Sequence, residues 1–205
     1  DTIRFTSAAF SPDGTKIVTG SRKSYVSVWE TNTGKKLSDF KAIPKNIYGE
    51  NGFDYPEAGS VMFSADGKFI LAGVADYTAV LWDSETGREL RKYKRSRSTC
   101  SSCITEAVIT PDNKYIISAY SDSLKVFDRE TGSLVKEIFG QGGTAECLSV
   151  SPDGRFIAGF EYGVAEIWDM KNWKLVTKTG DYSDRKVMSV ALSPDGKELL
   201  AGNEK

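Results

Sequence analysis

The residues of this 205-residue chain whose spacing could support metal or redox chemistry are Cys100 and Cys103. A Cys-x-x-Cys pair can begin a zinc site, but a structural zinc normally takes four ligands and the chain has no second pair. A redox role would favour a helix N-terminus, whereas this pair falls between predicted strands. We therefore interpret both thiols as incidental loop residues and predict no metal site.

A glycine-rich segment, residues 140–145 (GQGGTA), matches the spacing G-x-G-x-x-A of a dinucleotide-binding loop. That loop requires a following helix whose N-terminus holds the pyrophosphate, and here the next segment has the pattern of a strand. The chain has no histidine, the commonest general base, and no G-x-S-x-G nucleophile elbow. The sequence therefore predicts no catalytic residue, no cofactor and a protein that is not an enzyme.

The composition limits the partners and the compartment. The formal net charge is -1, so the molecule as a whole is not attracted to nucleic acid or to an anionic membrane surface. No apolar run approaches the roughly 18–20 residues of a membrane-spanning helix, and no signal-peptide pattern opens the chain. Three cysteines, an odd number, do not make a disulfide framework. These features predict an intracellular, cytoplasmic protein, with the nucleus as the alternative.

A four-residue turn signature recurs along the chain and organises it. Its copies are Ser11-Pro12-Asp13-Gly14, Ser64-Ala65-Asp66-Gly67, Thr110-Pro111-Asp112-Asn113, Ser151-Pro152-Asp153-Gly154 and Ser193-Pro194-Asp195-Gly196. Intervals of 53, 46, 41 and 42 residues indicate an array of similar units. Proline presets φ, aspartate caps the turn, and the closing glycine tolerates positive φ. Asn113 takes the glycine position once, and asparagine is the next best residue there.

Each signature lies between two short apolar runs, which predicts a β-hairpin. An aromatic residue and then an acidic one follow in each complete copy: Trp29-Glu30, Trp82-Asp83, Phe127-Asp128 and Trp168-Asp169. A second turn comes next: Thr33-Gly34, Thr86-Gly87, Thr131-Gly132 and the deviant Asn172-Trp173. A fourth strand follows each second turn, and four antiparallel strands per period make one propeller blade. The sequence predicts one domain over residues 1–205, with blades at about 4–42, 58–94, 104–139, 145–180 and, in part, 187–205.

In these features the chain resembles the WD-repeat β-propeller family, with the Trp-Asp dipeptide intact at Trp82-Asp83 and Trp168-Asp169. The Gly-His dipeptide of the family is missing throughout, so the family's His-Asp-Ser/Thr-Trp hydrogen-bond network cannot form as usual. The hydroxyl that this network takes from the second strand is present at Thr19 and Ser118 but replaced by Ala72. We therefore expect the blades to pack mainly through apolar contacts.

The resemblance implies an all-β propeller with four complete blades and half of a fifth. A seven-bladed ring, typical of the family, would need close to 300 residues at about 42 per blade. The favoured interpretation is that the chain is part of such a larger ring. Two alternatives remain: self-association or a partner chain completes the ring, because exposed strand edges invite pairing, or four to five blades close on themselves.

Tyrosines mark the rim where the resemblance places the turns between second and third strands. The four candidates for partner binding are Tyr25, Tyr77, Tyr120 and Tyr162, and the inter-blade connections on that rim add Tyr48, Tyr55 and Tyr182. Tyrosine supplies a large contact area at low entropic cost and is enriched at interface hot spots. The alternative interpretation is that tyrosine favours strand ends, where the ring packs and the hydroxyl stays hydrated.

Cations near the same rim suggest an acidic partner. The candidates are Arg22, Lys23, Arg95 and Arg97. Arg88, Arg91, Lys92 and Lys94 precede the last two, and we assign them to an outer strand, where such residues protect the edge. Nucleic acid is therefore a less favoured partner than an acidic peptide.

The predicted function is a non-catalytic scaffold that binds a protein or peptide on this rim. The competing interpretations are an accessory propeller of a larger enzyme, as in prolyl-oligopeptidase-like hydrolases, and a sensor module of a multidomain signalling or defence protein. The hydrolase interpretation draws on the Ser-Pro-Asp-Gly turns, which those blades also use. The Trp-Asp and Thr-Gly pairs argue against it.

Overall fold

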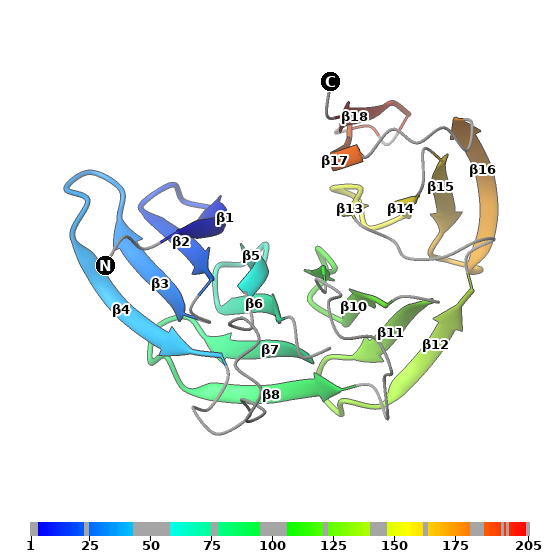
Figure 1. The fold of residues 1–205 in the computed structure, drawn as a ribbon. Coiled ribbons are helices and arrows are strands. Elements are labelled where there is room, and N and C mark those ends of the chain that lie inside the picture. Colours follow the sequence, from blue (N-terminus) through cyan, green and yellow to red (C-terminus); the bar gives the residue numbers. More distant parts are fainter. Residues whose placement is uncertain are drawn as a thin grey trace, which may run out of the picture. The chain divides into compact units, whose positions relative to one another are not determined.

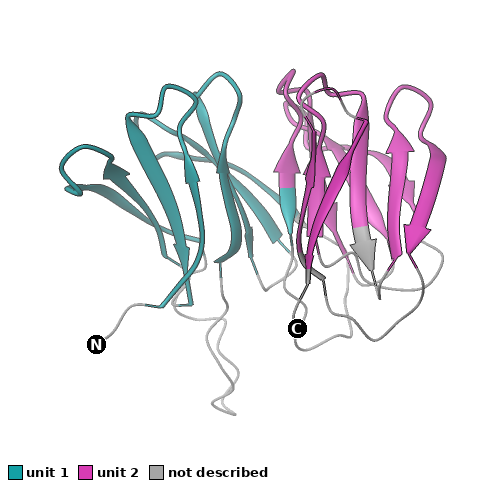
Figure 2. Ribbon diagram, turned by 90° about the horizontal axis from the view of Figure 1, so that it is seen from above, with its two compact units in different colours: residues 1–107 teal, residues 108–205 magenta. Residues whose placement is uncertain are grey.

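The computed structural model describes residues 4–22, 25–42, 58–74, 78–94, 106–120, 123–139, 147–161, 164–180, 187–193, 195 and 197–203. It divides into two compact units, residues 1–107 and 108–205, which are described separately below (Figure 2). Every regular element in the described ranges is a β-strand (Figure 1). Within those ranges there is no helix with the length and apolarity needed to cross a membrane.

The first unit contains two four-stranded antiparallel sheets whose strands follow one another in chain order. The first blade comprises β1 (Phe5–Phe10), β2 (Lys16–Ser21), β3 (Tyr25–Glu30) and β4 (Lys36–Lys41). The second blade comprises β5 (Ala58–Phe63), β6 (Phe69–Val74), β7 (Thr78–Asp83) and β8 (Glu89–Lys94). Each blade is therefore a meander of the kind predicted from the turn signatures.

The second unit repeats this plan. The third blade comprises β9 (Ala107–Ile109), which begins at the last residue of the first unit, β10 (Tyr115–Ala119), β11 (Leu124–Asp128) and β12 (Leu134–Ile138). The fourth comprises β13 (Cys147–Val150), β14 (Phe156–Glu161), β15 (Val164–Asp169) and β16 (Lys174–Gly180). A two-stranded sheet, β17 (Val187–Leu192) and β18 (Leu199–Asn203), follows. The predicted fold class, an all-β chain of four-stranded antiparallel blades, is confirmed.

The signature turns form because their side chains hold them closed. In the first copy the Ser11 hydroxyl donates to the Asp13 carboxylate at 2.6 Å, which also accepts the Thr15 N–H at 3.0 Å. These bonds, led by that of Ser11, lower the pKa of Asp13 to about 2. Asn113 has φ 59° where the other described copies have glycine at positive φ, as predicted.

The second turn uses the acid that follows the aromatic residue. Asp83 accepts the Thr86 N–H and hydroxyl, both at 2.7 Å, and Asp128 accepts the same pair from Thr131. The glycine that closes the turn has positive φ in three blades. In the fourth blade the closing residue is Trp173, which also has positive φ, at 57°.

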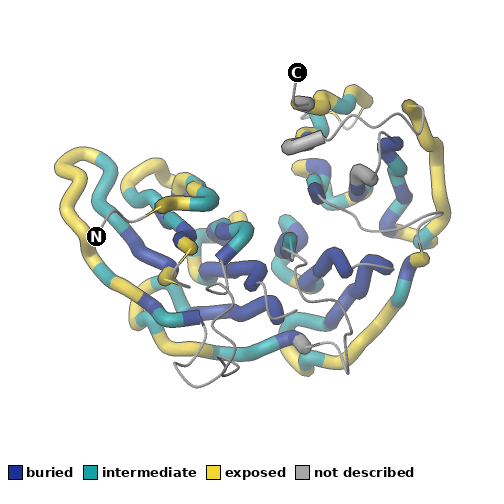
Figure 3. The backbone as a smooth tube through the Cα atoms, in the orientation of Figure 1, coloured by how far each residue is buried: buried dark blue, intermediate teal, exposed yellow. Residues whose placement is uncertain are grey.

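Apolar side chains join the two blades of the first unit. Val18, Val26 and Phe40 of the first blade form one buried cluster with residues of the second blade that include Ile70 and Trp82. The Phe40 and Trp82 rings stack with centroids 6.0 Å apart. Burial concentrates on the middle strands of each blade, whereas β16 is exposed along its whole length (Figure 3). Packing between these neighbouring blades is thus mainly apolar.

Serine hydroxyls add hydrogen bonds between neighbouring innermost strands. Ser7 Oγ accepts the Val61 N–H at 3.3 Å, and Ser60 Oγ accepts the Ala107 N–H at 3.1 Å. In the second unit Ser149 Oγ accepts the Leu192 N–H at 3.1 Å. Each bond satisfies a backbone donor that the sheet of its own blade leaves unpaired at that edge.

One hydrogen bond of the network described for WD repeats is present, although the chain has no histidine. Trp29 Nε1 donates to Thr19 Oγ at 2.8 Å in the first blade. In the third blade the equivalent hydroxyl, Ser118 Oγ, is buried without a partner, because Phe127 replaces the tryptophan and carries no N–H. Among the described residues, the network is therefore reduced to one pair, in one of the two blades that supply the hydroxyl.

Candidate protein-interaction surfaces

The residues predicted to bind a partner are only partly included in the described ranges. Arg22, Tyr25 and Tyr120 are described. The other five candidates lie outside the described residues: Lys23, Tyr77, Arg95, Arg97 and Tyr162. The same holds for the connection tyrosines, the two loop cysteines and the glycine-rich segment: Tyr48, Tyr55, Tyr182, Cys100, Cys103 and residues 140–145. The segment that follows those glycines is strand β13, as predicted.

Tyr25 opens β3 and is accessible on the first blade, with 39% of its surface exposed. Its N–H donates to Ser21 Oγ at 3.2 Å, which closes the turn between β2 and β3. The Lys41 ammonium lies 5.7 Å from the centre of its ring, a distance at which a cation is attracted to the ring face. Arg22 is exposed in the same turn, and its N–H donates to the Arg4 carbonyl at 3.1 Å. This end of the first blade therefore combines an accessible aromatic ring with cations.

Tyr120 occupies the equivalent turn of the third blade but is only 2% exposed. Its N–H donates to the Ser123 carbonyl at 2.9 Å, and the Lys125 ammonium lies 5.8 Å from its ring centre. Lys125 forms an ion pair with Glu137, which also accepts the Ser123 hydroxyl at 2.9 Å. Tyr120 thus packs beneath a polar cluster and offers little surface to a partner, in contrast to Tyr25.

Metal ligation has no support in the described ranges. No group of three or more histidine, cysteine, aspartate or glutamate side chains gathers there. The carboxylates of the signature turns instead accept hydrogen bonds from their own hydroxyls, at 2.6 Å for both Asp66 and Asp153. Cys147, the one cysteine within the described ranges, is buried and is not part of a disulfide.

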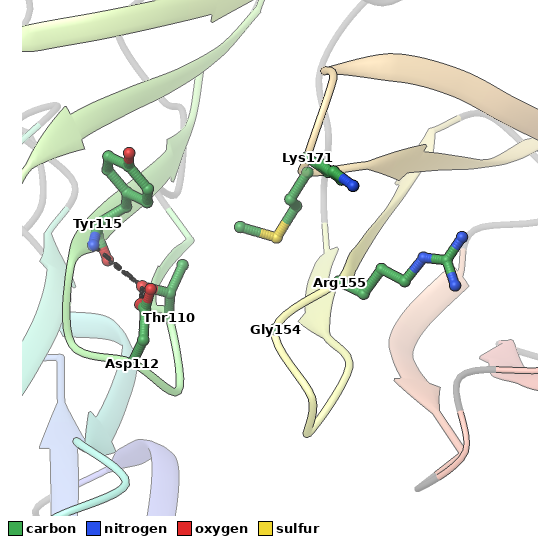
Figure 4. Close-up of a pocket in the computed structure, with 7 residues that line it drawn as sticks. Thr110, Asp112, Tyr115, Gly154, Arg155 and Lys171 are labelled. Carbon is green, nitrogen blue, oxygen red and sulfur yellow. Dashed lines mark hydrogen bonds between the residues drawn. The ribbon is translucent and has the colours of Figure 1, made fainter.

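A groove between the third and fourth blades was not predicted from the sequence. It lies at the signature turns, at the end of β10 opposite Tyr120, and encloses about 260 Å³. We call it the turn groove, and its lining residues are Thr110, Asp112, Tyr115, Gly154, Arg155, Met170 and Lys171 (Figure 4). The sequence signal that could have revealed it is the deviant second turn, Asn172-Trp173, because Trp173 packs against Tyr115.

Comparison with known proteins agrees with the blade structure. Residues 2–30 and 57–83 match the family model described as "WD domain, G-beta repeat", and each match ends at the acid that follows the blade's tryptophan. Autophagy-related protein 16 of Arabidopsis thaliana is 24% identical over 95% of this chain and 35% of its own length. A U3 small nucleolar RNA-associated protein 15 homolog of Xenopus laevis is 24% identical, covering 93% of this chain and 34% of its own length.

A third relative is named as a protein that contains WD repeats. The WD repeat-containing protein WDS homolog of Arabidopsis thaliana is 24% identical over 96% of this chain and 36% of its own length. The chain thus spans about a third of the length of these curated relatives. Residues 2–30 and 57–83 match the WD40 repeat model, and two further blades have the same four-stranded plan, so the chain is similar to WD-repeat proteins in both sequence and fold.

Proposed function

We propose that this chain is a non-catalytic scaffold that binds a protein or peptide through the turns between the second and third strands of its blades. The observation that carries the proposal is the end of the first blade, where an accessible tyrosine, Tyr25, lies beside the Lys41 ammonium and the exposed Arg22. Its relatives, including an autophagy-related protein and a U3 small nucleolar RNA-associated protein, support a role in assemblies of proteins. The odd number of cysteines supports a location inside the cell.

In the proposed binding mode, tyrosine rings supply the main contacts to the partner, and arginine and lysine side chains favour acidic partners. Tyr25 and Tyr77 supply apolar contact with a hydroxyl at the tip, which suits a partly hydrated interface. Arg22, Lys23, Arg95 and Arg97 favour acidic side chains, mainly by raising the association rate and by rejecting basic competitors. Tyr120 contributes by holding the β10–β11 turn in shape, since its ring is buried, and Tyr162 is proposed as a further anchor.

The test is site-specific cross-linking to an acidic partner. A photoreactive phenylalanine derivative replaces Tyr25, and in a matched control it replaces Leu37, which is similarly exposed on β4. We expect partner proteins to cross-link from position 25 and to be lost when Arg22→Glu and Tyr77→Ala are added. Equal cross-linking from both positions, or cross-linking unaffected by those substitutions, would reject the surface.

Self-association is a second candidate, favoured by two positions on the first blade that no described residue fills. A Cβ on Gly87 would lie 2.4 Å from the Phe40 ring, and one on Gly67 would lie 3.7 Å from Pro12, so neighbouring side chains fill both places. The equivalent positions of the first blade, Gly34 and Gly14, have no atom of the described residues within 4 Å. A second copy of the chain that presents similar side chains would fill them.

The face around these empty positions is apolar. Phe10 is 64% exposed and pairs across Ile17 with Trp29, so these three side chains share one side of the first blade. Sedimentation velocity over a hundredfold range of concentration provides the test, and we expect Phe10→Glu to shift the distribution towards monomer. Wild-type protein that is monomeric at every concentration would contradict self-association.

A further inference from the structure

Trp173, in the fourth blade, adopts a backbone conformation that disfavours a large side chain. Its φ of 57° lies in the left-handed region, at the position where the other complete blades have Gly34, Gly87 and Gly132. Trp173 keeps the backbone bond of that position, since its N–H donates to the Asp169 carbonyl at 2.7 Å. For an L-residue this conformation brings Cβ against the following carbonyl oxygen, and such outliers concentrate at binding sites.

The Trp173 side chain packs against a residue that lines the turn groove. Its ring meets the Tyr115 ring edge to face, with centroids 6.1 Å apart and planes inclined by 77°. Tyr115 opens β10 and lines the groove from the third blade. The first, second and fourth blades have Lys16, Phe69 and Phe156 at the equivalent position. The fourth-blade tryptophan and the third-blade tyrosine thus form an aromatic pair beside the groove.

Met170 gives the groove an apolar lining where the other blades use a polar residue. The equivalent Ser84 donates its hydroxyl to the Gly67 carbonyl at 2.6 Å, and the equivalent Arg129 donates Nε–H to the Asn113 carbonyl at 2.6 Å. Methionine has no donor, so Met170 cannot close its own signature turn in this way, and its side chain lines the groove instead. A flexible thioether beside aromatic rings is typical of adaptable binding surfaces.

Two cations flank the apolar wall. Arg155 and Lys171 lie across the groove from Tyr115 (Figure 4). The Arg155 side chain is 61% exposed and its Nε lies 3.5 Å from the Asp169 carboxylate, so much of the guanidinium faces solvent. On the other side, the Asp112 carboxylate already accepts the Lys114 N–H of its own turn at 3.0 Å. The groove therefore has an apolar wall, and the Arg155 guanidinium lies at its outer margin, pointing away from Tyr115 (Figure 4).

We propose that the turn groove binds a short segment of a partner protein in which a bulky apolar side chain, such as leucine, lies next to an acidic one. Its volume of about 260 Å³ is below the roughly 300–1,000 Å³ of small-molecule sites and suits one or two side chains. The apolar side chain packs on Tyr115, Met170 and Trp173, and the carboxylate meets the exposed Arg155 and Lys171 side chains at the outer margin of the groove. This site is separate from the tyrosine surface, because Tyr115 and Tyr120 lie at opposite ends of β10.

The test is a titration with three fluorescein-labelled peptides, followed by fluorescence anisotropy. The probe alternates leucine with glutamate, and its two controls replace every leucine by serine or every glutamate by lysine. We expect the probe to bind and both controls to bind at least about tenfold more weakly, because each loses one half of the recognition. Chemical-shift changes at the Trp173 indole N–H and the Met170 methyl group locate the bound probe.

Variants that introduce the residues found at equivalent positions of other blades test the site while keeping the blade fold. Trp173→Gly and Met170→Ser introduce the residues that the second blade carries, and we expect each to weaken probe binding by about tenfold. Arg155→Ala with Lys171→Ala should weaken it about threefold and reduce its salt dependence. The matched control is Lys68→Ala, the second-blade equivalent of Arg155, which should leave binding unchanged. Tyr25→Ala should also leave it unchanged, which separates this site from the proposed function.

Three results would overturn the proposal. The first is a probe that does not bind the wild-type chain at millimolar concentration. The second is binding of the serine peptide as tightly as the probe. The third is unchanged affinity in both Trp173→Gly and Met170→Ser, since at least one of these folded variants must lose the apolar wall.

Discussion

The junction between the first two blades and the junction between the third and fourth share one contact between their signature turns. They differ in the side chains that pack beside it. In both, a signature proline packs on the neighbouring signature glycine, with the glycine Cβ position 3.7 Å from Pro12 in one and 3.6 Å from Pro111 in the other. At the first junction Phe40 then stacks on Trp82 and fills the space beside Gly87. At the second, Trp173 stands in place of the glycine and a groove of about 260 Å³ remains.

The difference between the junctions lies in whether their side chains fill the space between the blades or leave a groove. At the first junction Gly87 has positive φ and no side chain, so the Phe40 ring can approach it closely. The side chains of this junction fill the space between the two blades. The second junction keeps the same backbone hydrogen bonds but accepts a disfavoured conformation at Trp173 and a methionine at position 170. Since neither change improves the turn itself, we interpret both as serving the surface that they create.

The largest expected effect is at the first junction. Gly87→Ala would place a methyl group 2.4 Å from the Phe40 ring at a φ of 70°. The left-handed conformation costs about 1–2 kcal/mol for alanine, and displacing a buried ring adds about 1–3 kcal/mol. We expect urea unfolding to show a loss of about 3 kcal/mol. Gly34→Ala is the matched control, because its φ is 67° but no described neighbour lies within 4 Å, and it should lose only about 1 kcal/mol. Equal losses would mean that Phe40 does not fill this space.

A smaller effect separates the first and third blades through the surviving tryptophan bond. Thr19→Val removes the acceptor of the Trp29 N–H and should cost about 1 kcal/mol in unfolding free energy. Ser118→Ala should be neutral or stabilising, since that hydroxyl is buried without a partner. Adding Phe127→Trp to the wild type would supply the missing donor, and its effect should disappear in the Ser118→Ala background. Identical costs for Thr19→Val and Ser118→Ala would contradict this comparison.

The smallest effect is shared by both units and depends on pH. Hydrogen bonds from Ser11 and Thr15 lower the pKa of Asp13 from 3.8 to about 2, and the Ser151 hydroxyl lowers the pKa of Asp153. Carboxyls with a lowered folded pKa stabilise the fold above their unfolded pKa and lose that contribution as pH falls. Stability should therefore decline between about pH 4 and pH 2, and Asp13→Asn should flatten the decline. A urea midpoint that is constant over this window would contradict the role of the turn carboxylates.

Much of the fold could be predicted from the sequence because its information is local. Proline, aspartate and glycine at fixed positions define the signature turns, and even Asn113 at φ 59° follows from the preferences of asparagine. The short apolar runs on either side then predict the strands. The order of strands in each blade could therefore be predicted without any information about contacts between distant residues.

The site could be predicted less well because it depends on contacts between strands and blades. The burial of Tyr120 arises where Lys125 and Glu137 face each other across β11 and β12, a register that the local pattern does not define. The turn groove arises from residues about 60 positions apart, Tyr115 and Trp173, whose approach requires two blades to pack. The deviant Asn172-Trp173 turn was visible in the sequence, but its meaning was not.

The central claim is that Trp173 serves binding more than it serves packing, and the unfolding free energy of Trp173→Gly tests it most directly. Removing the left-handed tryptophan gains roughly 1–2 kcal/mol, and losing its edge contact with Tyr115 costs roughly 0.5–1.5 kcal/mol. We therefore predict a stability within about 1 kcal/mol of the wild type in urea unfolding. A loss of about 3 kcal/mol or more, as for truncation of a core tryptophan, would contradict the claim.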